Sequence, residues 1–71
     1  MNQINPDKLL HSKWTAVQPE HKEKHFMVIQ CIRNEQEQIV DVILEAVMSH
    51  GEQTLYWRDL KDDQRWLMGW K

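Results

Sequence analysis

The sequence of 71 residues contains one cysteine, two glycines, two prolines and no long apolar run. Because Cys31 is the only cysteine, an internal disulfide and a cysteine-built metal site are both excluded. We expect Cys31, between Gln30 and Ile32, to be a small unreactive apolar side chain in a strand. A single unpaired cysteine is also typical of a cytoplasmic protein, which is the location we expect. Two glycines are too few for a glycine-rich loop that cradles a phosphate.

An excess of positive charge and a membrane segment are also missing. Nine basic and eleven acidic residues are mixed along the chain and leave a net charge of −2. A protein that binds duplex DNA usually presents a clustered basic face, so we expect no duplex binding. The longest apolar stretch, from Ile39 to Met48, is interrupted by Asp41 and Glu45 and is too short to span a membrane. Since residues 1–7 are polar, we expect no signal sequence.

Four tryptophans are the most informative residues that the sequence does contain: Trp14, Trp57, Trp66 and Trp70. The length predicts a single domain over residues 1–71, and a domain of this size buries only about 60% of the surface that its unfolded chain exposes. Each indole, if fully buried, would remove roughly 150–250 Å² from water. So small a core needs bulky side chains, which makes the tryptophans candidates for the core before they are candidates for a site.

Short alternating and β-branched segments predict a mostly β protein. Strands are expected over 13–17, 25–33, 54–58 and 66–70, each bounded by charged or turn-forming residues. In the second of these, Phe26, Val28 and Ile32 share one face of the strand and Met27, Ile29 and Cys31 share the other.

Two helical pieces accompany the strands. Asn5 can cap a helix and Pro6 suits its first position, so we expect a short N-terminal helix that ends before Ser12. A helical turn is expected over 59–63, where aspartate side chains bond to nearby backbone groups.

The segment 35–50 fits two different structures. The capping pattern that starts at Asn34 and the terminator Gly51 favour a helix, which would give an α+β fold. Five of the nine residues from Ile39 to Val47 are valine or isoleucine, and these side chains favour a strand paired with 25–33. With that strand, the five strands and the late helical turn predict a small antiparallel meander or a partly open five-stranded barrel of the SH3-like kind.

Several short motifs are spread over nearly the whole chain: Lys13-Trp14-Thr15, His25-Phe26, Leu44-Glu45-Ala46-Val47 and the ending Trp57-x-x-Leu60-x-Asp62…Trp66-x-x-Gly69-Trp70. In these motifs the chain resembles a family of small bacterial, tryptophan-rich conserved hypothetical proteins. The family is a domain of unknown function, so the resemblance implies no activity, cofactor or partner, although it does imply a hairpin at 35–50. Its signature residues, which we expect to be mainly structural, are Trp14, Phe26, Trp57, Leu60, Asp62, Trp66, Gly69 and Trp70.

One arrangement near the C-terminal end suggests a binding patch, because basic residues alternate there with tryptophans. Its members would be Trp66, Trp70, Arg65, Arg58 and Lys71. Aromatic faces flanked by cations can hold an extended peptide or stack single-stranded bases. We therefore expect a protein- or peptide-binding module, with a single-stranded nucleic-acid or RNA-associated module as the alternative.

A competing interpretation of the same residues is structural. It places Trp57 and Trp66 in the core and pairs Arg65 with Asp62 or Asp63. In either case we expect Trp70 to be partly exposed, because few residues follow it that could cover its ring.

The sequence gives little support for catalysis or for a metal site. His21 and His25 are four residues apart, but two further ligands would have to come from His11 or His50, and no four-ligand spacing is matched. The aspartates at 59, 62 and 63 lack the glycine and the bidentate glutamate of a calcium loop. We expect no cofactor and no catalytic residue, and a small metal-dependent enzyme is the remote alternative. The sequence identifies neither the partner nor the oligomeric state.

Overall fold

Five antiparallel strands form one open, strongly bent sheet in the computed structural model, which describes residues 1–71. The elements are the 3₁₀ turn η1 (Pro6–Lys8), the strands β1 (Lys13–Glu20), β2 (Glu23–Arg33), β3 (Ile39–Ala46) and β4 (Glu52–Tyr56), the 3₁₀ turn η2 (Trp57–Lys61) and the strand β5 (Trp66–Met68). The first four strands form a meander, and β5 returns beside β1 to give the order β4-β3-β2-β1-β5. The mostly β, partly open five-stranded fold predicted from the sequence is therefore confirmed.

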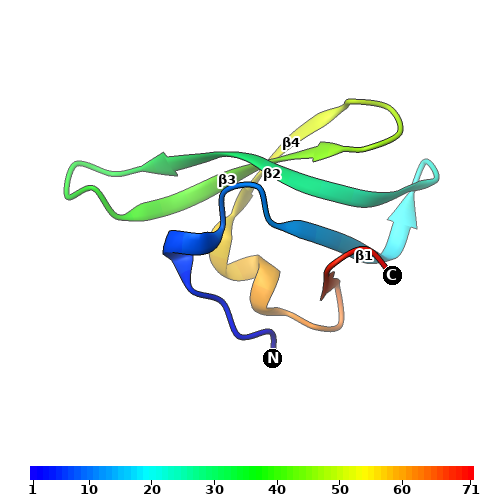
Figure 1. The fold of residues 1–71 in the computed structure, drawn as a ribbon, viewed down its shortest axis with the longest axis horizontal. Helices are drawn as coiled ribbons and strands as arrows, with labels where there is room; N and C mark the ends of the chain where they lie inside the picture. The colour runs from blue at the N-terminus through cyan, green and yellow to red at the C-terminus, as the bar shows by residue number, and fades with distance from the viewer.

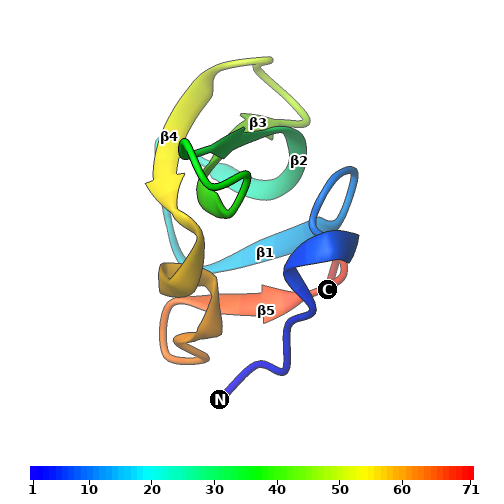
Figure 2. The same ribbon diagram turned by 90° about the vertical axis from the view of Figure 1, so that its left-hand side faces the viewer.

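The bend arises because the long strand β2 belongs to both halves of the sheet. Its first half pairs with β1, and the stretch from Phe26 to Arg33 pairs with β3. Figure 1 shows the β2–β3 hairpin extending beyond the rest of the molecule, and Figure 2 shows β4 descending past β1 to η2 and β5. The strands β4 and β5 lie at the two ends of the strand order, so the barrel stays open between them.

The contested segment is a strand, as its β-branched residues predict. β3 pairs with β2 from Ile39 to Ala46, and Val42, Leu44 and Ala46 are buried on one face. The expected apolar face ends there, because Met48 lies in the following turn and is exposed.

At the N-terminal end of the chain the expected helix is only the single 3₁₀ turn η1. Asn5 caps it as predicted by accepting a hydrogen bond from the Asp7 amide.

A β-bulge in β2 corrects the predicted face pattern of that strand. The register shifts between Val28 and Gln30, so one extra residue is inserted opposite β3. Beyond the bulge the alternation is reversed. Cys31 therefore lies opposite the buried Val42 and packs against the core, whereas Ile32 lies opposite Asp41. Strict alternation along the sequence could not reveal this exchange.

The connections differ from the sequence prediction in two places. β1 continues through Pro19 to Glu20, because Pro19 lies in an irregular stretch where β1 does not pair with β2 and its missing N–H costs no ladder bond. β4 ends at Tyr56, so Trp57 begins η2 instead of lying in a strand, and the expected helical turn is shifted to 57–61.

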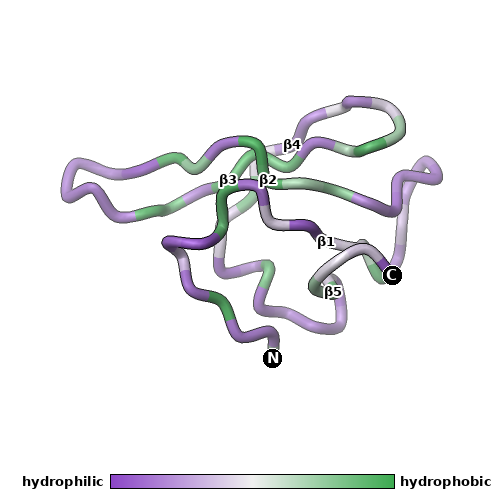
Figure 3. The backbone as a smooth tube through the Cα atoms, viewed as in Figure 1, coloured by the Kyte–Doolittle hydropathy of each residue, from purple (hydrophilic) through white to green (hydrophobic).

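A single hydrophobic core fills the space enclosed by the bent sheet. It contains Leu9, Trp14, Phe26, Val28, Val42, Leu44, Ala46, Trp57, Leu60 and Trp66. In Figure 3 the hydrophobic segments follow the central parts of β2 and β3, while the ends of the β1–β2 and β2–β3 hairpins are hydrophilic. Three of the four tryptophans therefore belong to the core. The structure contains no helix with the length and apolar character that a membrane crossing requires.

The β2–β3 loop contains a residue whose backbone is strained. Asn34 accepts a hydrogen bond from the Glu37 amide and donates one to the Gln38 carbonyl, which closes a three-residue loop. Glu37 has φ 64°, a left-handed conformation that favours glycine. We expect Glu37→Gly to raise stability by about 1 kcal/mol, or roughly 4–8 °C in Tm, measured by thermal unfolding. The matched change Glu35→Gly, in the same loop but at negative φ, should lower stability by about 0.4–1 kcal/mol.

Trp57 provides a direct test of the tryptophan core. Its side chain is 8% exposed although its neighbour Tyr56 is 47% exposed. We expect Trp57→Ala to lower the free energy of unfolding by about 3–5 kcal/mol, measured by urea denaturation. Tyr56→Ala should cost no more than about 1 kcal/mol. Equal effects of the two changes would show that Trp57 does not support the core.

Candidate binding site

The five residues of the predicted aromatic-basic patch lie in three separate places. Arg58 lies against Trp57, with its guanidinium carbon 5.2 Å from the ring centroid. Arg65 and Trp66 line a hollow between β1 and β4. Trp70 and Lys71 lie across β1 and β2. Trp66 is only 5% exposed, so its ring does not share an exposed surface with Trp70.

Trp70 is partly exposed, as the sequence predicts, and it is also anchored. Its side chain is 40% exposed, and its indole Nε1 donates a hydrogen bond of 2.9 Å to the Phe26 carbonyl. The Lys13 ammonium lies 4.8 Å from the ring centroid, and the His25 ring packs against it at 6.0 Å. One edge of the indole is therefore bound to the sheet and one face is covered by a cation.

Thr15 ties the segment after β5 to the sheet. Its hydroxyl donates to the Gly69 carbonyl at 2.7 Å and accepts from the Lys71 amide at 2.9 Å. The Thr15 side chain is 1% exposed, so these two bonds satisfy a hydroxyl that water does not reach. Gly69 has φ 80° and nothing within 4 Å of an added Cβ, so glycine is needed there for the bend and not for space.

Trp57 is covered by two cations. The Lys61 ammonium lies 5.2 Å from its ring centroid, the same distance as the Arg58 guanidinium carbon. Both cations come from η2 itself, so this arrangement is local. Because the indole is buried and already covered, the pair of Trp57 and Arg58 does not provide a free face on which a base or a peptide could stack.

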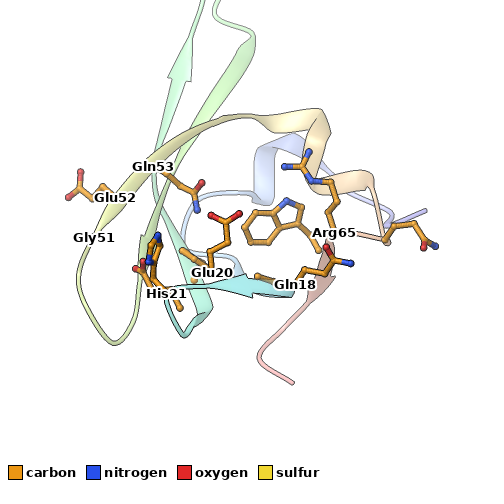
Figure 4. A pocket seen from close by; sticks show the side chains of 12 residues that line it. Gln18, Glu20, His21, Gly51, Glu52, Gln53 and Arg65 are labelled. Atoms are coloured by element: carbon orange, nitrogen blue, oxygen red, sulfur yellow. The ribbon is translucent and has the colours of Figure 1, made fainter.

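One hollow lies at the open part of the barrel, lined by residues of β1, of β4 and of the segment that leads into β5. We call it the seam hollow, and it has a volume of about 440 Å³. Its lining residues are Ala16, Gln18, Glu20, His21, Glu23, Phe26, Gly51, Glu52, Gln53, Gln64, Arg65 and Trp66. Figure 4 shows Glu20 from β1 and Gln53 from β4 pointing toward each other across it, while Glu52 points away.

An aromatic pair forms the apolar part of the seam hollow. The rings of Phe26 and Trp66 meet edge to face, with centroids 5.5 Å apart and an angle of 81°. The indole Nε1 of Trp66 is buried and has no hydrogen-bond acceptor. Every other buried side-chain nitrogen or oxygen has a hydrogen-bond partner. A buried unpaired N–H costs about 1–3 kcal/mol, so this position is not optimised for the stability of the free domain.

Part of the polar wall of the seam hollow consists of side chains without partners. Gln18 and Gln53 make no side-chain hydrogen bond, and Glu20 has neither a hydrogen bond nor an ion pair. Gln64 differs, because its side chain bonds to Asp63. Glu23 also differs, because it accepts a bond of 2.6 Å from the Ser49 hydroxyl. The hollow therefore offers two free amides and one free carboxylate above an apolar base.

These amides were missed by the sequence analysis, although a signal for them exists. Residues 14, 16, 18 and 20 alternate on one face of β1, which changes from the buried Trp14 through Ala16 to Gln18 and Glu20. Polar residues on the core-facing side of a strand indicate that the core ends and an opening begins. The sequence prediction ends this strand at Val17, before Pro19, and so leaves Gln18 and Glu20 outside it.

The remaining candidates from the sequence do not form a site. No group of three or more histidine, cysteine, aspartate or glutamate side chains is arranged to hold a metal ion. Asp62 forms a turn, accepting from the Gln64 amide at 2.9 Å. Arg65 makes no ion pair with it, and Asp63 instead pairs with the Met1 amino group. Burial raises the pKa of the Cys31 thiol, against a smaller opposing effect of Arg33, so the thiolate is disfavoured.

Comparison with known proteins gives one match. The profile of the family described as tryptophan-rich protein (DUF2389) matches residues 12–71. No curated protein and no solved structure matches the chain. All eight signature residues of the sequence analysis fall within the matched range. Of these, Trp14, Phe26, Trp57, Leu60 and Trp66 are in the core.

The hydroxyl of Thr15 should control the segment that carries Trp70. We expect Thr15→Val to lower stability by about 1–3 kcal/mol, because it leaves the Gly69 carbonyl and the Lys71 amide unpaired. The Trp70 indole N–H should then exchange with solvent faster than it does in the parent protein, measured by NMR. Thr54→Val, on the exposed edge strand β4, is the matched control and should change neither quantity. Unchanged exchange at Trp70 in Thr15→Val would show that the hydroxyl does not anchor this segment.

Proposed function

The chain belongs to the tryptophan-rich protein family, and we propose that it is a peptide-binding module that holds an extended segment of another protein in the seam hollow. The observation that carries the proposal is the combination of an apolar base, formed by Phe26 and Trp66, with unpaired amides at its wall. A volume of about 440 Å³ is within the range of roughly 300–1,000 Å³ that is typical of binding pockets.

The chemistry of the wall favours a peptide as the ligand. A glutamine side chain carries a carbonyl acceptor and an N–H donor, the same two groups that a peptide bond presents. Gln18 and Gln53 approach the hollow from β1 and β4, so an extended backbone between these strands can bond to both. The Phe26–Trp66 pair then accepts an apolar side chain of the segment.

The nucleic-acid alternative has less support from the same observations. Stacking on bases requires exposed aromatic faces, but Trp14, Trp57 and Trp66 are buried and Trp70 is covered by Lys13 on one face. Three glutamates and one arginine line the seam hollow, and this balance disfavours a phosphate backbone. For the remote enzyme alternative, no arrangement of side chains supplies support.

We also propose that the protein acts in the cytoplasm of a bacterium. The location follows from the single half-buried cysteine, which suits a reducing compartment. The bacterial origin follows from the resemblance of its motifs to bacterial sequences.

The test is selection of ligands from a library of random linear decapeptides, with affinities measured by fluorescence anisotropy. We expect enriched peptides to lose at least tenfold in affinity for the double variant Gln18→Ala/Gln53→Ala, because two amide partners are removed. Both side chains are exposed, so the variant should fold normally. A single-stranded oligonucleotide pool, measured in parallel, should bind more weakly than the peptides.

The matched control is Gln30→Ala, which truncates an exposed glutamine of β2 outside the hollow. It should leave the affinity unchanged. The proposal fails if no peptide is enriched, or if the enriched peptides bind the double variant as tightly as the parent protein. Tighter binding of the oligonucleotides would favour the nucleic-acid module instead.

A further inference from the structure

The strand β4 is a free edge that borders the seam hollow. It pairs with β3 on one side only, because it is the last strand in the sheet order. Its residues are exposed apart from the half-buried Leu55, and neither a helix nor a strand covers its outer edge. An uncovered edge presents unpaired N–H and C=O groups to any extended chain that approaches it.

The ladder between β3 and β4 shows which backbone groups are free. The Ala46 amide donates to the Gly51 carbonyl, so these two groups point toward each other between the strands. Along an antiparallel strand the backbone groups of successive residues point alternately toward and away from the partner strand. Gln53 and Leu55, which are two and four residues after Gly51, therefore also direct their backbone groups to β3. Glu52, Thr54 and Tyr56 therefore direct their N–H and C=O groups to the free edge.

The free edge and the hollow meet at the start of β4. Gly51, Glu52 and Gln53 belong to the lining of the hollow, and Glu52 is also the first residue with edge-directed backbone groups. An added strand that bonds to Glu52 and Thr54 thus places its alternate side chains over Phe26 and Trp66. We infer that the bound segment adds to β4 as a sixth strand, a binding mode that rests on the proposed function of the seam hollow.

The charges at the hollow indicate the chemistry of this segment. The Glu20 carboxylate points into the hollow and has no partner. Glu23, which pairs with Glu20 in the β1–β2 ladder, also lines the hollow. Arg65 is the only lysine or arginine among the lining residues. A lysine or arginine of the added strand would supply the missing counter-charge to Glu20. The partner is therefore an extended segment with a basic residue flanked by apolar ones.

A second copy of this chain fits the edge less well. Its own β4 carries the sequence Glu-Gln-Thr-Leu-Tyr, which contains no basic residue. Pairing of two β4 strands would leave Glu20 without a counter-charge in both copies. Charge complementarity thus favours a basic partner over self-association.

A backbone scan of the selected peptides tests strand addition. Each peptide amide is methylated in turn, which removes one donor and blocks close approach on that side. Only every second residue of an added strand donates to β4, so we expect a loss of at least tenfold at alternate positions and little change between them. Losses without this alternation, in a peptide that still needs Gln18 and Gln53, would overturn strand addition and leave the proposed function standing.

Substitutions on the protein give an independent measurement. Thr54→Pro removes an edge-directed N–H without breaking a bond to β3, so it should weaken peptide binding at least tenfold, while Thr54→Val should not. Glu20→Gln should lower the affinity for peptides with a basic residue about fivefold at low salt. Glu35→Gln, in the β2–β3 loop, should leave that affinity unchanged. Circular dichroism checks the fold of Thr54→Pro, and if that variant unfolds, the backbone scan on the parent protein decides.

Two other outcomes are informative. Absence of binding by every peptide would refute the proposed function itself. A dimer in sedimentation that peptides do not dissociate, together with loss of that dimer in Thr54→Pro, would assign the edge to a second copy and overturn the basic partner.

Discussion

Burial of three indoles in one small core is the constraint on which the rest of the structure depends. Trp14 comes from β1, Trp57 from the start of η2 and Trp66 from β5, so the three rings connect the two ends of the strand order through the interior. A domain of this size has little other apolar surface to bury. The bend of the sheet, the bulge in β2 and the 3₁₀ turn η2 all bring backbone around these rings.

The regions outside the sheet are fixed by hydrogen bonds to that core. The Asn2 side-chain amide donates to the carbonyls of Leu60 and Trp66, each at 2.8 Å, which ties the N-terminal segment to η2 and β5. Leu9 is 1% exposed and belongs to the core, although it precedes the range matched by the family profile. After β5, the Thr15 hydroxyl and the Trp70 indole hold the opposite end of the chain in the same way. Short segments without regular structure are ordered here by a few specific bonds.

The seam hollow results from the same limit on size. Five strands enclose the core, but β4 and β5 do not pair, so the barrel has an opening where β1 loses its apolar side chains. The opening combines free amides and a free edge strand with the Phe26–Trp66 pair. Exposed amides are hydrated and cost nothing, but an uncovered edge strand favours unwanted pairing in the isolated domain. The occurrence of these features together at one place is the physical reason to associate the opening with a binding partner.

The sequence by itself determined the mostly β fold, and it favoured a strand at 39–47 over a helix and predicted a helical turn before the last strand. The structure confirms the strand over Ile39–Ala46 and shifts the turn from 59–63 to 57–61. β-branched content and turn-forming aspartates are local properties, and they agree with the final structure at these positions. It also indicated that a small domain must bury most of its tryptophans. Only the tertiary structure decided that Trp66 is interior and that Trp70 is bound at its edge, because both outcomes depend on contacts with distant residues such as Phe26. The face exchange in β2 and the seam hollow were likewise beyond the sequence, since a bulge changes the alternation and an opening is defined by strands that do not pair.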